Sequence, residues 1–172
     1  MNPLISVVRA QQAINRSSWP VAETDRVATL IGVISQAAEK WARRKFKKTT
    51  HDLILSYQRD PLWLPNGPIH QIVSITEGSS LRPLSFEALL SLGQVLLGGG
   101  FADWGETTPP ERLVRVVYEG GFDPIPDDIQ EAVALWTASS YWQTEQDPAS
   151  AREGPPPAAA CLLRPYRKTL FP

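Results

Sequence analysis

Apolar residues recur at helical spacing along two long stretches of the chain. From Asp25 to about Phe46, and again from about Asp127 to Thr144, they return every three or four positions. The positions of the two stripes are Val27, Leu30, Ile31, Ile34, Ala38, Trp41 and Ala42, and Ile129, Ala132, Val133, Trp136 and Ser140. Such a stripe is typical of a helix that buries one face. The pattern therefore predicts two long amphipathic helices, the first capped by Asp25.

Shorter stretches are rich in strand-forming residues, and one of them alternates strictly between two faces. Strands are predicted over residues 49–57, 63–64, 69–76 and 113–119. In the third, the alternation places Ile69, Gln71, Val73 and Ile75 on one side. Short helices are predicted over residues 7–14, 85–92 and 158–166. The predicted fold class is mainly α with a small β-sheet (α+β): a helical bundle built on the two long amphipathic helices, with short antiparallel strands.

The stretch between the last strand and the second long helix has the character of a structural joint. The strand stops at the pair Gly120-Gly121, and a short loop with two prolines follows. The helix then opens with Asp127 and Asp128, whose negative charges suit the positive end of the helix dipole. Helix capping explains these carboxylates better than a metal site does.

Composition describes an ordinary globular chain with a distinct C-terminal end. At 172 residues the chain is long enough to bury a stable core without the help of a disulfide or a metal ion. Residues 147–157 are rich in Pro, Gly, Ala and Ser, as linkers are. We therefore expect a core domain over residues 1–146, and a Pro-rich linker and C-terminal docking tail over residues 147–172.

Charge, cysteine count and motifs exclude several classes of function. The net charge of −1 gives no general attraction to nucleic acid, and no stretch has the ~20 apolar residues of a membrane helix. Cys161 is the single cysteine, so no intramolecular disulfide forms. The only histidines, His51 and His70, lack the spacing of a zinc site. Gly98-Gly99-Gly100 lacks the Lys-Ser/Thr ending of a phosphate loop. We expect no enzyme, no metal and no cofactor.

A basic cluster follows the first long helix. Its members are Arg43, Arg44, Lys45, Lys47 and Lys48. One interpretation is a solvated helix end, where cations complement the helix dipole. Two others are salt bridges to a neighbouring subunit and contact with the phosphates of DNA. Contact with DNA would arise either where DNA passes through the lumen of a ring of subunits or in a small nucleic-acid-binding module that uses the 43–48 cluster.

The C-terminal tail combines large apolar groups with cations. Apolar groups stand at Leu162, Leu163, Tyr166, Leu170 and Phe171, and cations at Arg164, Arg167 and Lys168. A tail of this composition either folds back on the protein's own helices or inserts into a partner. The residues leave both alternatives open.

Several segments, taken in order, resemble the head–tail connector (adaptor) proteins of tailed bacteriophages, also called head-completion proteins. The segments are Ala37 to Phe46, Leu62 to Pro65, Pro68 to Ile75, Val116 to Phe122, Ile125 to Ile129 with the helix after it, and Leu162 to Arg167. The family usually has Gly before the arginine that ends the first long helix, whereas this chain has Ala42 before Arg43.

The resemblance implies a structural part of the virion. Such proteins form a dodecameric ring under the portal, at the virion neck, and join the portal to the stopper or tail completion protein. DNA only passes through the channel during packaging, no membrane is involved, and the chain is made in the bacterial host cytoplasm. The resemblance also favours docking of the tail on the portal. The docking residues would be Leu162, Leu163, Arg164, Pro165, Tyr166, Arg167 and Phe171.

Overall fold

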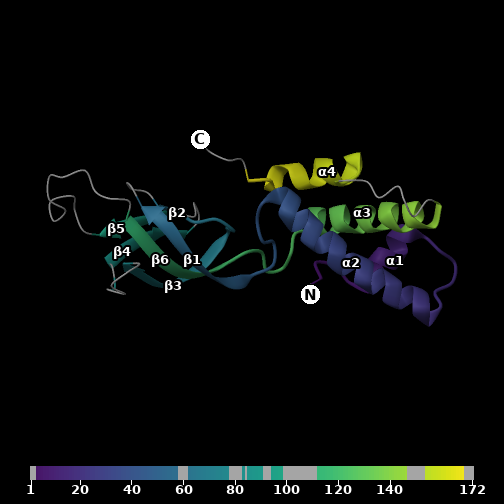
Figure 1. The fold of residues 1–172 in the computed structure, drawn as a ribbon, viewed down its shortest axis with the longest axis horizontal. Coiled ribbons are helices and arrows are strands. Elements are labelled where there is room, and N and C mark those ends of the chain that lie inside the picture. The colour runs from purple at the N-terminus through teal and green to yellow at the C-terminus, as the bar shows by residue number, and fades with distance from the viewer. Residues whose placement is uncertain are drawn as a thin grey trace. The chain divides into compact units, whose positions relative to one another are not determined.

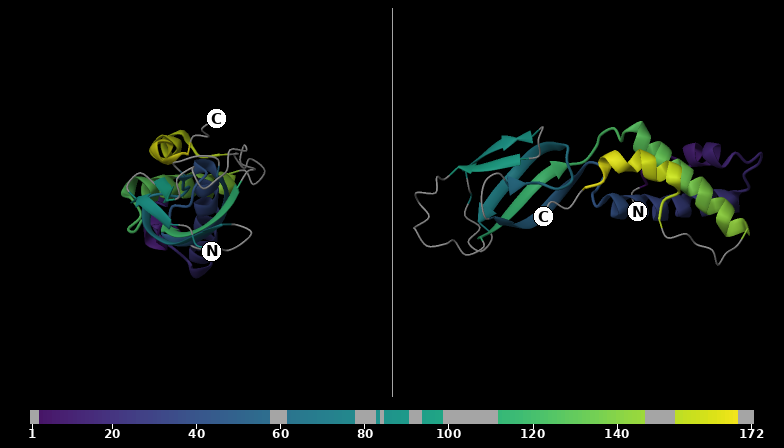
Figure 2. Two further views of the ribbon diagram at one scale, coloured as in Figure 1. Left: turned by 90° about the vertical axis from the view of Figure 1, so that its left-hand side faces the viewer. Right: turned by 90° about the horizontal axis from the view of Figure 1, so that it is seen from above.

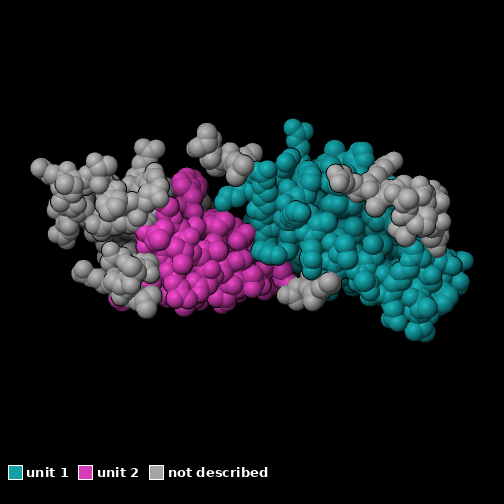
Figure 3. Space-filling model, viewed as in Figure 1, with its two compact units in different colours: residues 1–46, 124–172 teal, residues 47–123 magenta. Residues whose placement is uncertain are grey.

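A computed structural model of the chain shows an α+β fold with four α-helices and two small antiparallel sheets in the part it describes. That part covers residues 3–57, 62–77, 83, 85–90, 94–98, 112–146 and 154–168. The chain divides into two compact units, coloured in Figure 3. The helical unit comprises Met1–Phe46 and Pro124–Pro172, and the β unit comprises Lys47–Asp123.

This division differs from the expected boundary between a core of residues 1–146 and a tail of residues 147–172. Residues 154–168 belong to the same unit as the long helices, while residues 47–123 form a unit of their own. The reason is that the strands bury their apolar side chains against one another, and the C-terminal helix buries its own against the long helices.

The helical unit is built around one central helix. Its elements are α1 (Val7–Ile14), α2 (Val21–Ala42), α3 (Asp127–Gln146), α4 (Pro157–Leu163) and the 3-10 turn η3 (Arg164–Tyr166). Helix α3 packs against α1, α2 and α4, and Figures 1 and 2 show α4 running alongside it. The start of α3 at Asp127 confirms the prediction.

Helix α2 begins four residues earlier than predicted. Pro20 is its N-cap residue and no side chain caps it, so the assignment of Asp25 as N-cap is wrong. The helix ends where Arg43 adopts a left-handed backbone with φ of 56°. Glycine is the usual residue for that conformation, and here an arginine takes it. The Arg43 N–H donates to the carbonyl oxygens of Glu39 and Lys40, which completes the cap.

The described residues of the β unit form two three-stranded antiparallel sheets. The strands are β1 (Thr49–Tyr57), β2 (Leu62–Trp63), β3 (Ile69–Glu77), β4 (Ser85–Leu89), β5 (Gln94–Gly98) and β6 (Arg112–Gly120). One sheet has the order β1-β6-β3 and the other β2-β5-β4. The short helix predicted over residues 85–92 is wrong, because residues 85–89 form a strand that pairs with β5. Residues 91 and 92 lie outside the described residues.

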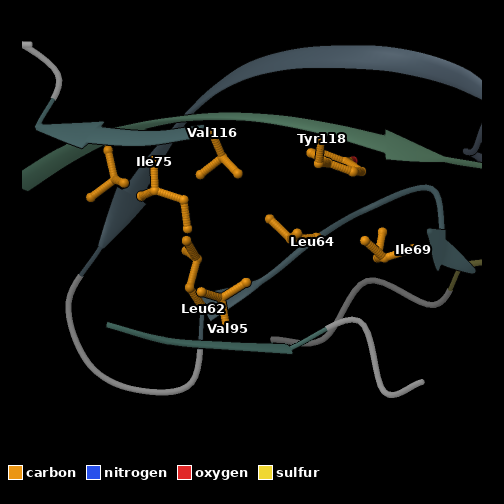
Figure 4. Packing of buried hydrophobic residues seen from close by; sticks show 8 residues of the cluster. Leu62, Leu64, Ile69, Ile75, Val95, Val116 and Tyr118 are labelled. Atoms are coloured by element: carbon orange, nitrogen blue, oxygen red, sulfur yellow. The ribbon is translucent and has the colours of Figure 1, made fainter. Parts of the chain in front are cut away.

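The core of the β unit lies between residues of both sheets. Figure 4 shows Leu62 and Val95 of one sheet pointing toward Ile75 and Val116 of the other. Tyr118 completes the cluster at one end, fully buried. These side chains come from strands far apart in sequence, so the cluster forms only when the whole unit is assembled.

Strand β3 departs from the predicted alternation at two bulges. Its register against β6 shifts between Ile69 and Gln71, and again between Ile72 and Ser74. Each bulge inserts one residue and reverses the faces beyond it. As a result Ile69, Ile72 and Ile75 all contribute to the core, whereas Val73 is 57% exposed. The prediction that Gln71 and Val73 share a face with Ile69 and Ile75 is wrong for this reason.

Candidate functional site

The C-terminal segment from Pro157 to Lys168 is held against the helical unit. Leu163 is fully buried and Leu162 is half-buried, whereas Arg164 and Pro165 are exposed. Helix α4 thus uses its buried side to complete the core around α3. Phe171, the last of the expected docking residues, lies outside the described residues.

Aromatic and backbone contacts fasten the segment to the end of α2. The ring of Tyr166 packs edge-on against Phe46, with 6.3 Å between centroids. The guanidinium of Arg167 lies 5.0 Å from the centroid of the Trp41 ring, a cation–π contact. The Lys168 N–H donates to the Ala42 carbonyl oxygen at 2.9 Å, at the C-terminal end of the helix where carbonyls lack helical partners.

Burial and neighbouring charges change the pKa values of three ionisable groups at this junction. Burial lowers the pKa of Arg44, and the charge of Tyr166 opposes that change. Burial raises the pKa of Tyr166, and Asp128 adds to the rise by its charge and by a 3.4 Å hydrogen bond from the Tyr166 hydroxyl. Burial lowers the pKa of Lys168, helped by the positive charge of Arg44. The junction is therefore a partly desolvated contact.

Of the two alternatives for the tail, fold-back and insertion into a partner, residues 157–168 show fold-back onto the protein's own helices. The expected docking set does not form one outward surface: Leu163 and the Tyr166 ring face the helical unit. Arg164, Pro165 and Arg167 of the set are exposed in the described segment, and the Arg167 guanidinium is engaged by the Trp41 ring. Among the described members of the set, a docking surface for a partner has Arg164, Pro165 and Arg167 available.

The five members of the basic cluster have different surroundings. Lys45 contacts a Glu39 carboxylate oxygen at 2.7 Å, and Lys48 contacts Glu119 at 3.5 Å. Arg44 is half-buried at the junction with Tyr166. Arg43 and Lys47 are exposed. The 43–48 segment also spans the boundary between the two units, so sequence proximity does not make it one described surface.

The Gly120-Gly121 pair acts as the expected structural joint. Gly121 has φ of +115°, and a Cβ there would lie 2.5 Å from the carbonyl oxygen of Lys47. Both histidines bind this joint: His51 Nε2 is 3.3 Å from the Gly120 carbonyl oxygen, and His70 Nε2 is 2.7 Å from that of Gly121. Since a carbonyl only accepts, both imidazoles donate here, which gives them a structural role.

A surface that the sequence did not single out is the outer edge of β1. One edge of this strand pairs with β6 without a register shift from Thr49–Gly120 to Tyr57–Arg112. Among the residues that the structure describes, no strand pairs with its other edge. The signal was present in the segment Thr49–Tyr57, which contains neither proline nor lysine. Those residues usually protect edge strands.

The described residues form no group of three or more His, Cys, Asp or Glu side chains placed to hold a metal ion. In the same part of the chain, no helix combines the length and the apolar character needed to cross a membrane.

By sequence, the chain matches no family model and no curated protein. By structure, it is similar to chains of a gene transfer agent (GTA) particle. One belongs to the virion of the native particle, with 14% identity and a TM-score of 0.66 over 98% of this chain and 91% of that one. Another belongs to the neck of the empty particle computed with C6 symmetry, with 16% identity and a TM-score of 0.67 over the same shares. A third, from the neck of the native particle computed with C12 symmetry, has 18% identity and a TM-score of 0.55 over 99% and 96%. The chain shares the fold of these particle components.

Proposed function

We propose that the chain is a structural virion protein, a head–tail connector (adaptor) that forms a ring under the portal and joins it to the stopper or tail completion protein. The observation that carries the proposal is the likeness in fold, over 98% of the chain, to chains in the virion and neck of a gene transfer agent particle. The protein acts in the virion neck after synthesis in the host cytoplasm. Its role is adhesive and mechanical, and it catalyses no reaction.

The ring is dodecameric in this proposal, a number supported by the C12 symmetry used for the neck that contains a similar chain. A cyclic ring joins identical subunits head to tail, so each copy presents two different surfaces to its neighbours. Symmetry also repeats every exposed charge around the ring. Four cluster members are exposed to face a neighbour or the DNA channel: Arg43, Lys45, Lys47 and Lys48. Of these, Lys45 and Lys48 also contact carboxylates of the same chain.

Portal docking is assigned to the end of the chain. Arg164 and Pro165 are exposed, and the last four residues, Thr-Leu-Phe-Pro, add the apolar side chains of Leu170 and Phe171. An apolar anchor flanked by cations fits a groove with an acidic rim. The buried Leu163 stays in the helical unit in this proposal.

The test is the mass of the complex in solution, measured by light scattering after gel filtration. The full chain is compared with a chain that ends at Lys168, each alone and mixed with the portal protein from the same genome. We expect a defined ring complex for the full chain and its loss for the shortened one. The shortened chain keeps the contacts of α4 and η3, so circular dichroism should show an unchanged fold.

Two outcomes would contradict parts of the proposal. A shortened chain that still binds the portal would move the docking surface elsewhere. A full chain that forms no complex at any salt concentration, yet binds DNA with a steep salt dependence, would favour the nucleic-acid-binding module instead. The carboxylate contacts of Lys45 and Lys48 already weaken that alternative, because these cations are partly neutralised.

A further inference from the structure

The outer edge of β1 has the properties of a strand-binding site. It is nine residues long, and its pairing with β6 keeps an unbroken register, so the strand is regular over its full length. Edge strands are normally blunted by bulges, prolines, lysines or a short length. Strand β1 has none of these. A regular edge presents alternate N–H and C=O groups that another extended chain can pair with.

The opposite edge of the same sheet is blunted. Strand β3 carries two register shifts in its pairing with β6, which interrupt its regular geometry. It also forms an isolated bridge to Pro83 at Thr76, which occupies part of its outer side. The two edges therefore differ in kind, and only that of β1 is regular along its whole described length.

The single carboxylate on β1 does not repel an incoming strand. Asp52 receives two hydrogen bonds from the Arg115 guanidinium, at 2.8 Å and 2.6 Å. This fork neutralises the charge within the sheet and holds the side chain toward β6. The Arg115 contact also lowers the pKa of Asp52, so the carboxylate stays ionised and paired near neutral pH.

Apolar groups beside the edge are incompletely covered. Ile54 on the outer face is 63% exposed, and Leu113 of β6, diagonal to it, is 53% exposed. On the inner face, Leu53 and Leu55 pack against the core cluster but are only partly buried. A strand added at the β1 edge would cover more of these two side chains.

We propose that the β1 edge binds an extended segment of a neighbouring copy of this chain, which adds a fourth strand to the sheet. The inference rests on the ring of the proposed function, in which identical copies flank each subunit. Because a cyclic ring needs two different surfaces, the added segment is one other than β1 itself. The added strand pairs its backbone with β1 and covers Ile54, Leu53 and Leu55.

The test uses amide hydrogen exchange, followed by mass spectrometry, on the full chain alone and assembled with the portal protein. We expect backbone amides in Thr49–Tyr57 to become protected by more than tenfold on assembly, because a paired strand closes the outward N–H groups. Cross-linking of a mixture of isotope-labelled and unlabelled copies should join residues 49–57 of one copy to another copy.

A pair of matched variants supplies the second measurement. Ile54→Lys places a lysine on the regular edge, and Val73→Lys places one on the blunted edge at a comparably exposed position. Both positions point to solvent, so both variants should fold. We expect Ile54→Lys to weaken ring assembly at least tenfold and Val73→Lys to leave it unchanged.

Each contrary result has a distinct meaning. A ring whose β1 amides exchange as in the free chain overturns the inference but leaves the connector function intact. Protection without cross-links between copies also overturns it, because the portal would then be the occupant. A closed dimer of the free chain, lost in Ile54→Lys, overturns it in favour of β1 pairing with β1. Failure of the wild-type chain to assemble with the portal overturns the connector proposal and this inference together.

Discussion

The C-terminal segment and the β1 edge differ in whether the groups that could bind a partner are already used within the fold. Residues 157–168 carry conspicuous apolar and aromatic side chains, yet Leu163 and Tyr166 are used within the helical unit. Strand β1 has few conspicuous residues, yet its backbone edge is open among the described residues. The difference teaches that adhesive composition and available surface are separate properties. A side chain is available only if its own fold leaves it unused, and a backbone edge is available only if no strand or bulge blocks it.

The largest effect is expected from breaking the β unit at its joint. Gly121→Ala forces a Cβ to within 2.5 Å of the Lys47 carbonyl oxygen and 2.6 Å of its carbon, at a φ of +115°. Because backbone atoms cannot move aside cheaply, we expect the free energy of unfolding to fall by more than about 4 kcal/mol. Urea denaturation followed by circular dichroism measures this.

Gly154→Ala is the matched control for that substitution. Gly154 has nearly the same φ, +110°, but a Cβ there meets nothing within 4 Å. Only the backbone strain remains, so we expect a loss of about 1 kcal/mol. Similar losses for the two variants would mean that the close approach of Lys47 does not constrain the joint.

The next effect tests whether the C-terminal segment is part of the helical core. Leu163 is fully buried, so Leu163→Ala should lower the free energy of unfolding by about 3 kcal/mol. Leu162 is half-buried, and Leu162→Ala should cost about 1 kcal/mol. Thermal or urea unfolding compares the two. Equal small losses would indicate that α4 detaches readily, and docking by the whole tail would regain support.

Unfolding at alkaline pH tests the burial of Tyr118 in the core of the β unit. Burial raises the pKa of Tyr118 to about 12, from an ordinary value of 10.0. The folded state therefore keeps the phenol proton more tightly than the unfolded state. This contribution to stability is complete below pH 10 and is lost between about pH 10 and 12. The free energy of unfolding should therefore fall as the pH rises through this window.

Tyr118→Phe isolates this contribution. The variant loses the hydrogen bond from the Tyr118 hydroxyl to the Pro65 carbonyl oxygen, which should cost about 1 kcal/mol at neutral pH. Its unfolding free energy should then fall less steeply above pH 10 than that of the wild type. Some decline remains, since the pKa of Tyr166 is also raised. Parallel curves for wild type and variant would show that Tyr118 ionises freely in the folded state.

The smallest expected effect concerns the cation–π contact of the C-terminal segment. Arg167→Ala removes the guanidinium over Trp41 and should cost about 0.5 kcal/mol, the value for an exposed contact. Arg164→Ala, at an exposed position in the preceding turn, should change the free energy of unfolding by less still. Measuring both variants in urea decides whether the contact fastens the segment. A larger loss for Arg164 would contradict the assigned contacts.

Local periodicity was enough to locate most helices and strands. The spacing of apolar residues predicted α3, and a short apolar segment predicted α1. The β-rich runs predicted β1 and β6 almost to the residue, because these patterns reflect one buried face. The Gly120-Gly121 pair was identified as a joint because few other residues fit such a turn. The α+β class follows from these elements.

Other features depended on contacts between distant segments. The β3 bulges turn Ile72 inward and Val73 outward because the strand must match β6, and residues 85–89 form a strand because β5 lies beside them. Likewise, Leu163 is buried only because α3 offers a surface, and the β1 edge is open only because of the strand order. The sequence by itself determined most of the helices, strands and turns, since those depend largely on neighbouring residues. The tertiary structure alone decided which faces and edges remain available for a partner, since burial is shared between segments far apart in the chain.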